Sequence, residues 1–348
     1  MPVTVAGCSY PTSAELRMLQ MDLLPRFSEG RLAFDILPFT ESDAAEILFQ
    51  QPDIFRGMQQ WRGLDQPTNV VGQRYNPYGK ICTVAPGYWG EHDYISEEFM
   101  TRAAQPGTCS TPIDLTEYIA RLSERLMERR YNRVEFLIWQ SLVFGRYEAL
   151  NSSGQVVHQA QYNVQQVAAA IPWSDFANST PMGDFRQIQL RSRGTSASFN
   201  SDAIAYMNRV TANCLFQNQN PNDVGKVGLS ACCTFMGPDM VNQQFAAQGL
   251  PQLKIYDEGY VDDYGNFQPY IPDGYVVIVG RRPGGVPIGH FWLTRNAVGC
   301  EISKGFWQKI IDDCERAIPR KIGLYDGFNG GPAIEYPRAI VVLQTGCN

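Results

Sequence analysis

One uninterrupted helical pattern constrains this chain more than any other feature. Apolar residues recur at spacings of three and four from Tyr118 to Val143, and Gly145 then ends the pattern. Asp114 followed by Glu117 has the spacing of a capping box, which marks the start of a helix. We therefore predict one helix over residues 115–144, which would be about 45 Å long at 1.5 Å per residue. Such a helix is well beyond the average of about 12 residues.

The middle of this predicted helix is rich in arginine. Glu124 and Glu128 are interspersed among the arginines at helical spacing. We interpret the group as a solvent-exposed face that carries some ion pairs along the helix. The arginines are Arg121, Arg125, Arg129, Arg130 and Arg133.

Residues 55–109 show a different pattern, because glycines and prolines interrupt them and no helical period survives. Within this segment Asn76-Pro77-Tyr78-Gly79 matches a type I turn, which predicts a hairpin of strands 69–75 and 80–84. A long segment with so little core pattern indicates a functional arm or a mobile loop.

The rest of the chain reads as mixed helices and strands, which indicates an α+β fold. Thr12 and Glu15 form a second capping-box pattern, and the helix that follows should end at Pro25. We also predict hairpins over 146–162 and 260–270. Strands are predicted over 227–235, 253–256, 275–280 and 338–343. Three further helices are predicted: one capped by Ser201 or Asp202, one from Gly237 to Gly249, and one over 306–318 that is followed by a glycine-rich turn.

Composition excludes several classes of protein. The chain has 348 residues, enough for one elaborate domain or two, and its net charge is -6. Only 18% of residues are charged, which argues against disorder and coiled coils, and the negative balance argues against a protein that grips nucleic acid over its whole surface. No apolar run approaches the ~18 residues of a membrane helix, and the first residues do not resemble a signal peptide, so we expect a soluble, unsecreted protein.

Residues that could carry chemistry form no convincing site. His92, His158 and His290 lie far apart in the sequence, and the nine cysteines include no CxxC pair, so neither a zinc site nor a redox dithiol is indicated. The glycines and arginines of residues 281–285 fit a plain loop better than a phosphate cradle. Asp257, Glu258, Asp262 and Asp263 are interpreted as a solvated hairpin tip rather than a cation site. We therefore expect no cofactor and no metal.

The terminal arm, the long interrupted segment and the over-long helix together leave more surface than one subunit can bury. Something else must cover this surface. An enzyme that uses the carboxylates near Asp262 on a sugar or phosphate substrate is one class of function that stays open. Metal-dependent activity lost on replacing Asp262 and Asp263 would favour the enzyme.

The order of the elements resembles the tailed-phage major capsid protein family typified by the lambda capsid protein (protein E), which has the Hong Kong 97-type fold. Five stretches carry the resemblance and together span nearly the whole chain. They are Pro86-Gly87-Tyr88 leading to Glu97, Met100 and Arg102; residues 142–147 at the end of the long helix; residues 235–239; residues 255–274 with Tyr260, Gly265 and Ile271-Pro272-Asp273-Gly274; and the closing segment with Pro332, Pro337 and residues 339–343, which looks like a peripheral strand.

The resemblance implies a structural virion protein with no catalytic residue, which assembles in the host cytoplasm into hexamers and pentamers of an icosahedral head around double-stranded DNA. It implies an N-terminal arm (1–54), an extended loop (55–110), a peripheral domain with the long spine helix (111–200), an axial domain (201–300), and a C-terminal helix with a strand returning to the peripheral domain (301–348). Scaffolding, portal and cement proteins are the expected partners, and DNA is expected only as non-specific contents. The alternative within this resemblance is another virion or shell component, such as a cellular encapsulating compartment or a tail protein.

Assembly contacts are expected where the loop and the arm would reach neighbouring subunits. Oxidation of released particles could also join thiols across subunits, whereas Cys214, Cys233 and Cys314 fall on apolar stripes and should stay reduced. The predicted contact residues are Trp61, Tyr75, Tyr78, Cys82, Tyr88, Trp89, Arg281 and Arg282, and the candidates for intersubunit disulfides are Cys8, Cys82, Cys109 and Cys347.

Overall fold

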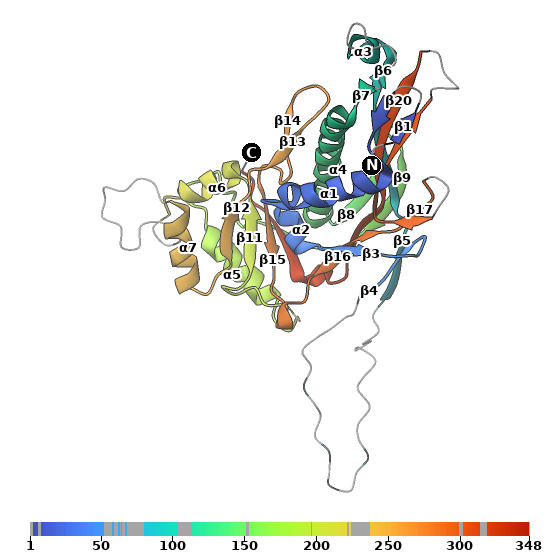
Figure 1. The fold of residues 1–348 in the computed structure, drawn as a ribbon. Helices are drawn as coiled ribbons and strands as arrows, with labels where there is room; N and C mark the ends of the chain where they lie inside the picture. Colours follow the sequence, from blue (N-terminus) through green and yellow to red (C-terminus); the bar gives the residue numbers. More distant parts are fainter. Residues whose placement is uncertain are drawn as a thin grey trace.

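The long helix α4 (Thr116–Phe144) stands at the centre of the computed structural model, between a long sheet and the amino-terminal helix α1 (Figure 1). The helix is confirmed, but the predicted capping box is wrong. Leu115 is the N-cap, and the Asp114 carboxylate instead accepts a hydrogen bond from the Thr116 amide at 2.9 Å. Gly145 ends the helix in the left-handed conformation at φ 64°, which only glycine adopts without strain.

The structure describes residues 3–5, 8–51, 58, 62, 64, 67, 80–103, 113–150, 153–195, 197–220, 223, 237–298, 302–313 and 319–347.

Helix α1 (Ser13–Ser28) crosses α4 and is followed by the short helix α2 (Leu32–Ile36). The capping box of Thr12 and Glu15 is confirmed, since both reciprocal hydrogen bonds are present. Pro25 does not end the helix as expected. The helix continues to Ser28 because the amide of Glu29 still bonds to the Pro25 carbonyl, and burial of Phe27 in the core holds the last turn in place.

The long sheet is organised by strand β20 (Lys321–Ile334). Its antiparallel partners are β19 (Phe306–Asp312), β6 (Gly87–Ser96) and β16 (Gly289–Leu293), and β3 (Phe39–Glu41) pairs in parallel with β16. The predicted helix over 306–318 is therefore wrong for residues 306–312, and residues 314–318 lie outside the described part. A short apolar run such as Phe306 to Ile311 fits a strand as well as a helix, and here β20 supplies the strand partner.

The glycine-rich turn predicted after residue 318 is also a strand. Gly327 and Gly330 lie inside β20, where an added Cβ would meet backbone of the neighbouring strands β6 and β16. Glycine here permits close packing of the sheet rather than a change of direction.

A second sheet forms the unit at the left of Figure 1, with the order β10-β21-β15-β11-β12. The strands are β10 (Gln165–Ala168), β21 (Ile340–Gln344), β15 (Tyr275–Val279), β11 (Ile204–Met207) and β12 (Gln252–Ile255). Helices α5 (Pro181–Arg191), α6 (Arg209–Phe216) and α7 (Pro238–Ala247) accompany the strands.

One expectation for this unit is wrong. Residues 204–207 are strand rather than helix, because they pair with β12 and β15, and the helix begins later, at an Asn208 cap that accepts the Thr211 amide at 2.9 Å. The predicted closing strand is β21, which pairs with β10 in this sheet. It inserts between β10 and β15, because its four consecutive buried residues need a partner on both edges and both faces.

Smaller ribbons complete the fold, and several confirm predicted hairpins. β8 (Arg146–Leu150) pairs with β9 (Val156–Gln161), and β13 (Gly259–Val261) pairs with β14 (Phe267–Pro269). The strand predicted over 80–84 is β5 (Lys80–Val84), whose partner is β4 (Ile47–Gln51), while the predicted 69–75 strand and the 227–235 strand lie outside the described residues. The remaining elements are β1 (Val3–Val5), β2 (Cys8–Tyr10), β7 (Ile113–Asp114), α3 (Glu97–Ala103), β17 (Arg295–Asn296), β18 (Ser303–Lys304), and the 3-10 turns Pro283–Gly285 and Pro337–Ala339. Within the described chain, no helix is both long and apolar enough to span a membrane.

Candidate functional site

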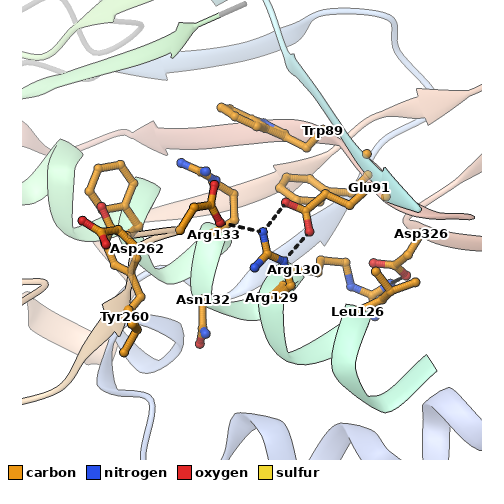
Figure 2. Close-up of a pocket in the computed structure, with 16 residues that line it drawn as sticks. Trp89, Glu91, Leu126, Arg129, Arg130, Asn132, Arg133, Tyr260, Asp262 and Asp326 are labelled. Atoms are coloured by element: carbon orange, nitrogen blue, oxygen red, sulfur yellow. Dashed lines mark hydrogen bonds and ion pairs between the residues drawn. The ribbon is translucent and has the colours of Figure 1, made fainter. Parts of the chain in front are cut away.

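A groove of about 340 Å³ lies beside the middle of α4 (Figure 2). Three elements form it: α4 supplies the floor, β6 and β20 supply one wall, and the β13–β14 hairpin supplies the other. Its polar lining combines arginines from α4 with carboxylates from the two walls. These residues are Arg129, Arg130, Arg133, Glu91, Asp262, Asp263 and Asp326.

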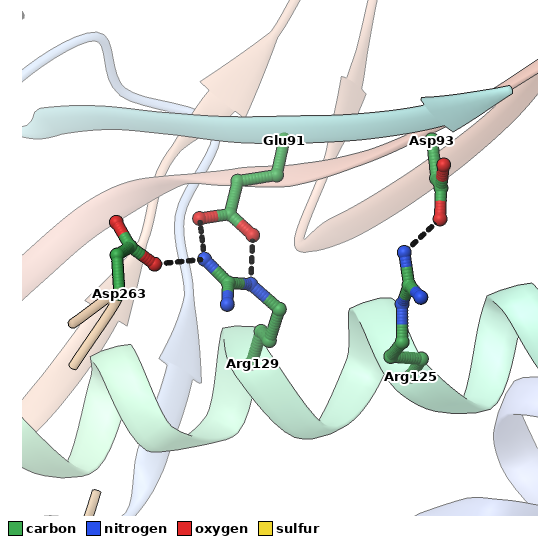
Figure 3. Close-up of polar contacts among 5 residues, drawn as sticks. All are labelled: Glu91, Asp93, Arg125, Arg129 and Asp263. Carbon is green, nitrogen blue, oxygen red and sulfur yellow. Dashed lines mark hydrogen bonds and ion pairs between the residues drawn. The ribbon is translucent and has the colours of Figure 1, made fainter. Parts of the chain in front are cut away.

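Two arginines on the exposed side of α4 bind carboxylates of β6 (Figure 3). Arg129 makes a two-pronged contact with Glu91, at 2.5 Å from Nε to Oε2 and 3.0 Å from Nη2 to Oε1, and a longer one with Asp263 at 3.7 Å. This bonding to Arg129 lowers the pKa of Glu91. Arg125 pairs with Asp93 on the same strand. The two pairs tie the helix to the edge strand of the long sheet.

The neighbouring Arg130 points in a different direction and is buried. Its Nη1 lies 2.6 Å from Oδ1 of Asp326 on β20, and each side chain is only 3% exposed. The guanidinium also lies over the Phe306 ring, 4.5 Å from the centroid. Burial raises the pKa of Asp326 to about 6, although the charge of Arg130 opposes this shift.

The interpretation of the arginines as a solvent-exposed face is confirmed for four of the five positions, and it is wrong for Arg130, which is buried. Arg121 does pair along the helix with Glu117, at 2.6 Å. Arg133 instead lies over the rings of Trp89 and Phe136, at 5.3 and 5.8 Å from their centroids. Arg125 and Arg129 are exposed yet pair with carboxylates of β6, so these charges find partners far away in the sequence rather than along the helix.

The hairpin wall is rigid at its turn and exposed at its tip. The Asp262 carboxylate accepts the amides of Tyr264 at 3.0 Å and Asn266 at 2.8 Å, and the backbone bond from Asn266 lowers its pKa. The expectation of a hairpin tip carrying these acids is confirmed. Among the described residues, no group of three or more His, Cys, Asp or Glu could hold a metal ion.

The predicted contact residues fall in separate places. Cys82 lies on β5 and Tyr88 and Trp89 lie near the start of β6, where Tyr88 is 66% exposed and Trp89 packs on Phe328. Arg281 and Arg282 follow β15 at the far end of the other sheet, and Arg282 stacks on Tyr336. Trp61, Tyr75 and Tyr78 lie outside the described residues.

The cysteines correct two expectations. Cys347 forms a disulfide with Cys214 of α6 in the same chain, with Cα atoms 6.6 Å apart, so Cys214 is not reduced and Cys347 is not available to another subunit. The residues after β21 turn back over α6, where Thr345 donates to the Gly274 carbonyl at 2.8 Å and Cys347 is 2% exposed. Cys8 is buried, with its sulfur 3.9 Å from that of Met100. Cys82 is partly buried, whereas Cys109, Cys233 and Cys314 lie outside the described part.

Sequence reasoning missed a second buried ionic group on α4. Glu135 accepts hydrogen bonds from Arg31, at 2.8 Å, and from the Tyr256 hydroxyl, and Arg31 also bonds to Asn132 at 2.6 Å. Burial raises the pKa of Glu135. The sequence did contain a signal for this buried carboxylate, because Glu135 stands between Val134 and Phe136 in the most apolar part of the helix. The cluster joins α4 to the amino-terminal segment and to the end of β12.

Comparison with known proteins agrees with this architecture. The model of the family Phage major capsid protein E matches residues 70–288, which is more than half of the chain. No curated protein matches the sequence. Among solved structures, a protein described as a prophage capsid protein of E. coli CFT073 is 13% identical, with 99% of each chain covered and a TM-score of 0.57. A phage-related protein of Bordetella bronchiseptica RB50 is 12% identical, with 94% of this chain and 97% of that chain covered and a TM-score of 0.54. The chain therefore belongs to the phage major capsid protein E family, as a structural protein of the virion head with the Hong Kong 97-type fold.

Proposed function

We propose that copies of this chain assemble into hexamers and pentamers, which close an icosahedral head around double-stranded DNA. The family match over residues 70–288 is the observation that carries this proposal. The net charge of -6 suits a container that encloses a genome without adhering strongly to it.

Exposed apolar side chains on three elements support assembly. Met18 and Met21 on the outer side of α1 are 64% and 71% exposed, and Leu48 and Ile81 on the β4–β5 ribbon are 55% and 68% exposed. The register of the ribbon pairs Leu48 with Thr83 and Gln50 with Ile81, so Leu48 and Ile81 share its outer face. Surfaces of this kind mark sites of protein contact.

We assign residues 1–54 and 55–110 to contacts with neighbouring subunits. The proposed contact residues include Cys82 and Tyr88, which the structure describes, and Trp61, Tyr75 and Tyr78, which lie outside the described part. Arg281 and Arg282 are proposed contacts of the axial unit. Scaffolding, portal and cement proteins are proposed partners. The protein acts through assembly and not through catalysis, and Cys82 and Cys109 remain the candidates for bridges between subunits.

Expression alone and with a scaffolding protein, followed by sedimentation and negative-stain microscopy, tests the assembly. We expect closed or tubular particles. A monomer that persists under every condition would contradict the proposal.

Replacement of residues 52–79 by a short Gly/Ser linker tests the assigned loop. Gln51 and Lys80 are register partners at the ends of β4 and β5, so a short linker can join them. Circular dichroism should show an intact fold, and sedimentation should show no particles. The replacement stops before β6, because β6 pairs with β20 over ten residue positions of the long sheet. Normal particles from this variant would rule out the loop assignment.

A further inference from the structure

The two ends of the second sheet carry opposite charges. Strand β15 runs antiparallel to β11 and β21, so loops that flank it emerge at opposite ends of the same layer. The β13–β14 hairpin precedes β15 at one end, and Arg281 follows it at the other. Figure 1 shows the hairpin at the upper end of this unit and the end of β15 below. At about 3.4 Å per residue, the five residues of β15 separate these ends by roughly 17 Å.

One end is basic and partly apolar. Arg191 and Arg193 lie at the end of α5, and the bridge between Ser198 and Arg281 brings Arg281 to the same place. All three arginine side chains are exposed, and none forms an ion pair with any described residue. Leu190 on α5 and Val286, five residues after Arg281, are 53% and 47% exposed. We call this surface the basic end.

Few acidic groups offset this charge. Asp202 stands just before β11, whose first residue Ile204 pairs with Val279 at the end of β15, and forms no ion pair with the described chain. Glu335 is engaged with His290, at 2.8 Å. Arg282 is held over the Tyr336 ring and adds a further positive charge.

The other end is acidic and also partly apolar. Glu258 and Asp263 are exposed on the hairpin, and Asp263 has only a long contact to Arg129, at 3.7 Å. Asp257 pairs with Arg209 at 3.5 Å. Tyr264 is 91% exposed at the tip, with Val261 and Phe267 at 62% and 57% as cross-strand partners behind it. We call this surface the acidic tip.

We propose that the acidic tip of one copy docks on the basic end of a second copy. Each surface combines one sign of charge with exposed apolar side chains, so the two are complementary in both respects. The turn is already fixed by Asp262, so docking orders little additional chain. A contact between two different surfaces of one chain repeats head to tail and closes into rings. The exposed Leu190 and Val286 favour a protein partner over the charged and polar sugar–phosphate backbone of a nucleic acid.

Charge reversal tests the pairing, and the inference rests on the proposed assembly. Arg193→Glu/Arg281→Glu and Glu258→Lys/Asp263→Lys should each lower the yield of particles by about tenfold, because like charges across an interface are strongly unfavourable. A chain that carries all four changes should regain particles. The matched control, Arg121→Glu/Arg295→Glu, changes two exposed arginines outside the assigned contact segments and should assemble as the wild type does. Circular dichroism confirms that each variant folds.

A mixture of the two double variants gives a sharper result. Copies of the two kinds can alternate around a ring of six, where every tip meets an end of opposite charge, but they cannot alternate around a ring of five. The mixture should therefore restore hexamer-based sheets or tubes and not closed particles.

Three outcomes overturn the inference or its basis. Wild-type yields from either double variant, or no rescue by the fourfold variant, would overturn the docking and leave the proposed function intact. Loss of binding to a DNA duplex from Arg193→Glu/Arg281→Glu with normal assembly would assign the basic end to nucleic acid. Failure of the wild type to form particles with a scaffold would instead overturn the proposed function.

Discussion

Arg129 and Arg130 are adjacent in the sequence and have the same chemistry, yet they lie in opposite environments. Arg129 and its partner Glu91 are each 49% exposed, whereas Arg130 and its partner Asp326 are each 3% exposed. Successive residues on an α-helix point about 100° apart, so one arginine faces the edge strand β6 and the other faces the interior of the sheet at β20. Because both arginines form an ion pair, we expect burial to decide how much each one contributes to the free energy of unfolding.

The largest effect is expected from Arg130→Met, which leaves the buried carboxylate of Asp326 without its counter-charge. The free energy of unfolding at pH 7 should fall by about 3 to 5 kcal/mol. Denaturant unfolding followed by circular dichroism measures it. The double variant Arg130→Met/Asp326→Leu removes both charges and should recover most of the loss. If the double variant is no more stable than Arg130→Met, isolation of the Asp326 charge is not the cause.

The pH dependence of the same pair should be the next largest effect. The pKa of Asp326, about 6 when folded, lies above its ordinary value of 3.8, so the folded chain binds this proton more tightly than the unfolded chain. Ionisation of Asp326 therefore lowers stability as the pH rises through about 6. Relative to Asp326→Asn, the wild type should gain about 2 kcal/mol of unfolding free energy as the pH falls from 7 to 4. A constant difference between the two proteins over this range would show that the pKa is not raised.

Arg129→Ala should have a much smaller effect than Arg130→Met. Half-exposed ion pairs contribute about 1 kcal/mol or less, and salt screens them. We expect a loss below about 1 kcal/mol that shrinks at high ionic strength, together with a rise in the pKa of Glu91 measured by NMR titration. A loss as large as that of Arg130→Met would contradict the comparison.

Arg121→Ala should have the smallest effect of the series. Arg121 and Glu117 are 73% and 82% exposed and pair within one helix, and such pairs contribute about 0.3 kcal/mol. Thermal unfolding should barely distinguish this variant from the wild type. If Arg121→Ala lost more stability than Arg129→Ala, the exposure of an arginine would not predict how much it contributes to the stability of the fold.

The elements that were predicted well are those with strong local signals. Helix α4 and the hairpins 146–161 and 259–269 each have a clear period or turn, and Thr12 with Glu15 marked the start of α1. The strands β11 and β19 were expected as helices, because their short apolar runs fit both periods. Only pairing with β15 and β20 decided between the two.

The sequence by itself determined the long helix, the mixed α+β class and the resemblance to phage capsid proteins, because these depend on patterns within short stretches of chain. Only the tertiary structure decided which charges of α4 are buried, where β21 inserts, and that Cys347 meets Cys214. The physical reason is that these outcomes depend on contacts between residues far apart in the sequence, such as Arg130 with Asp326. Such contacts arise when the sheets close around the helix, and no local pattern records them.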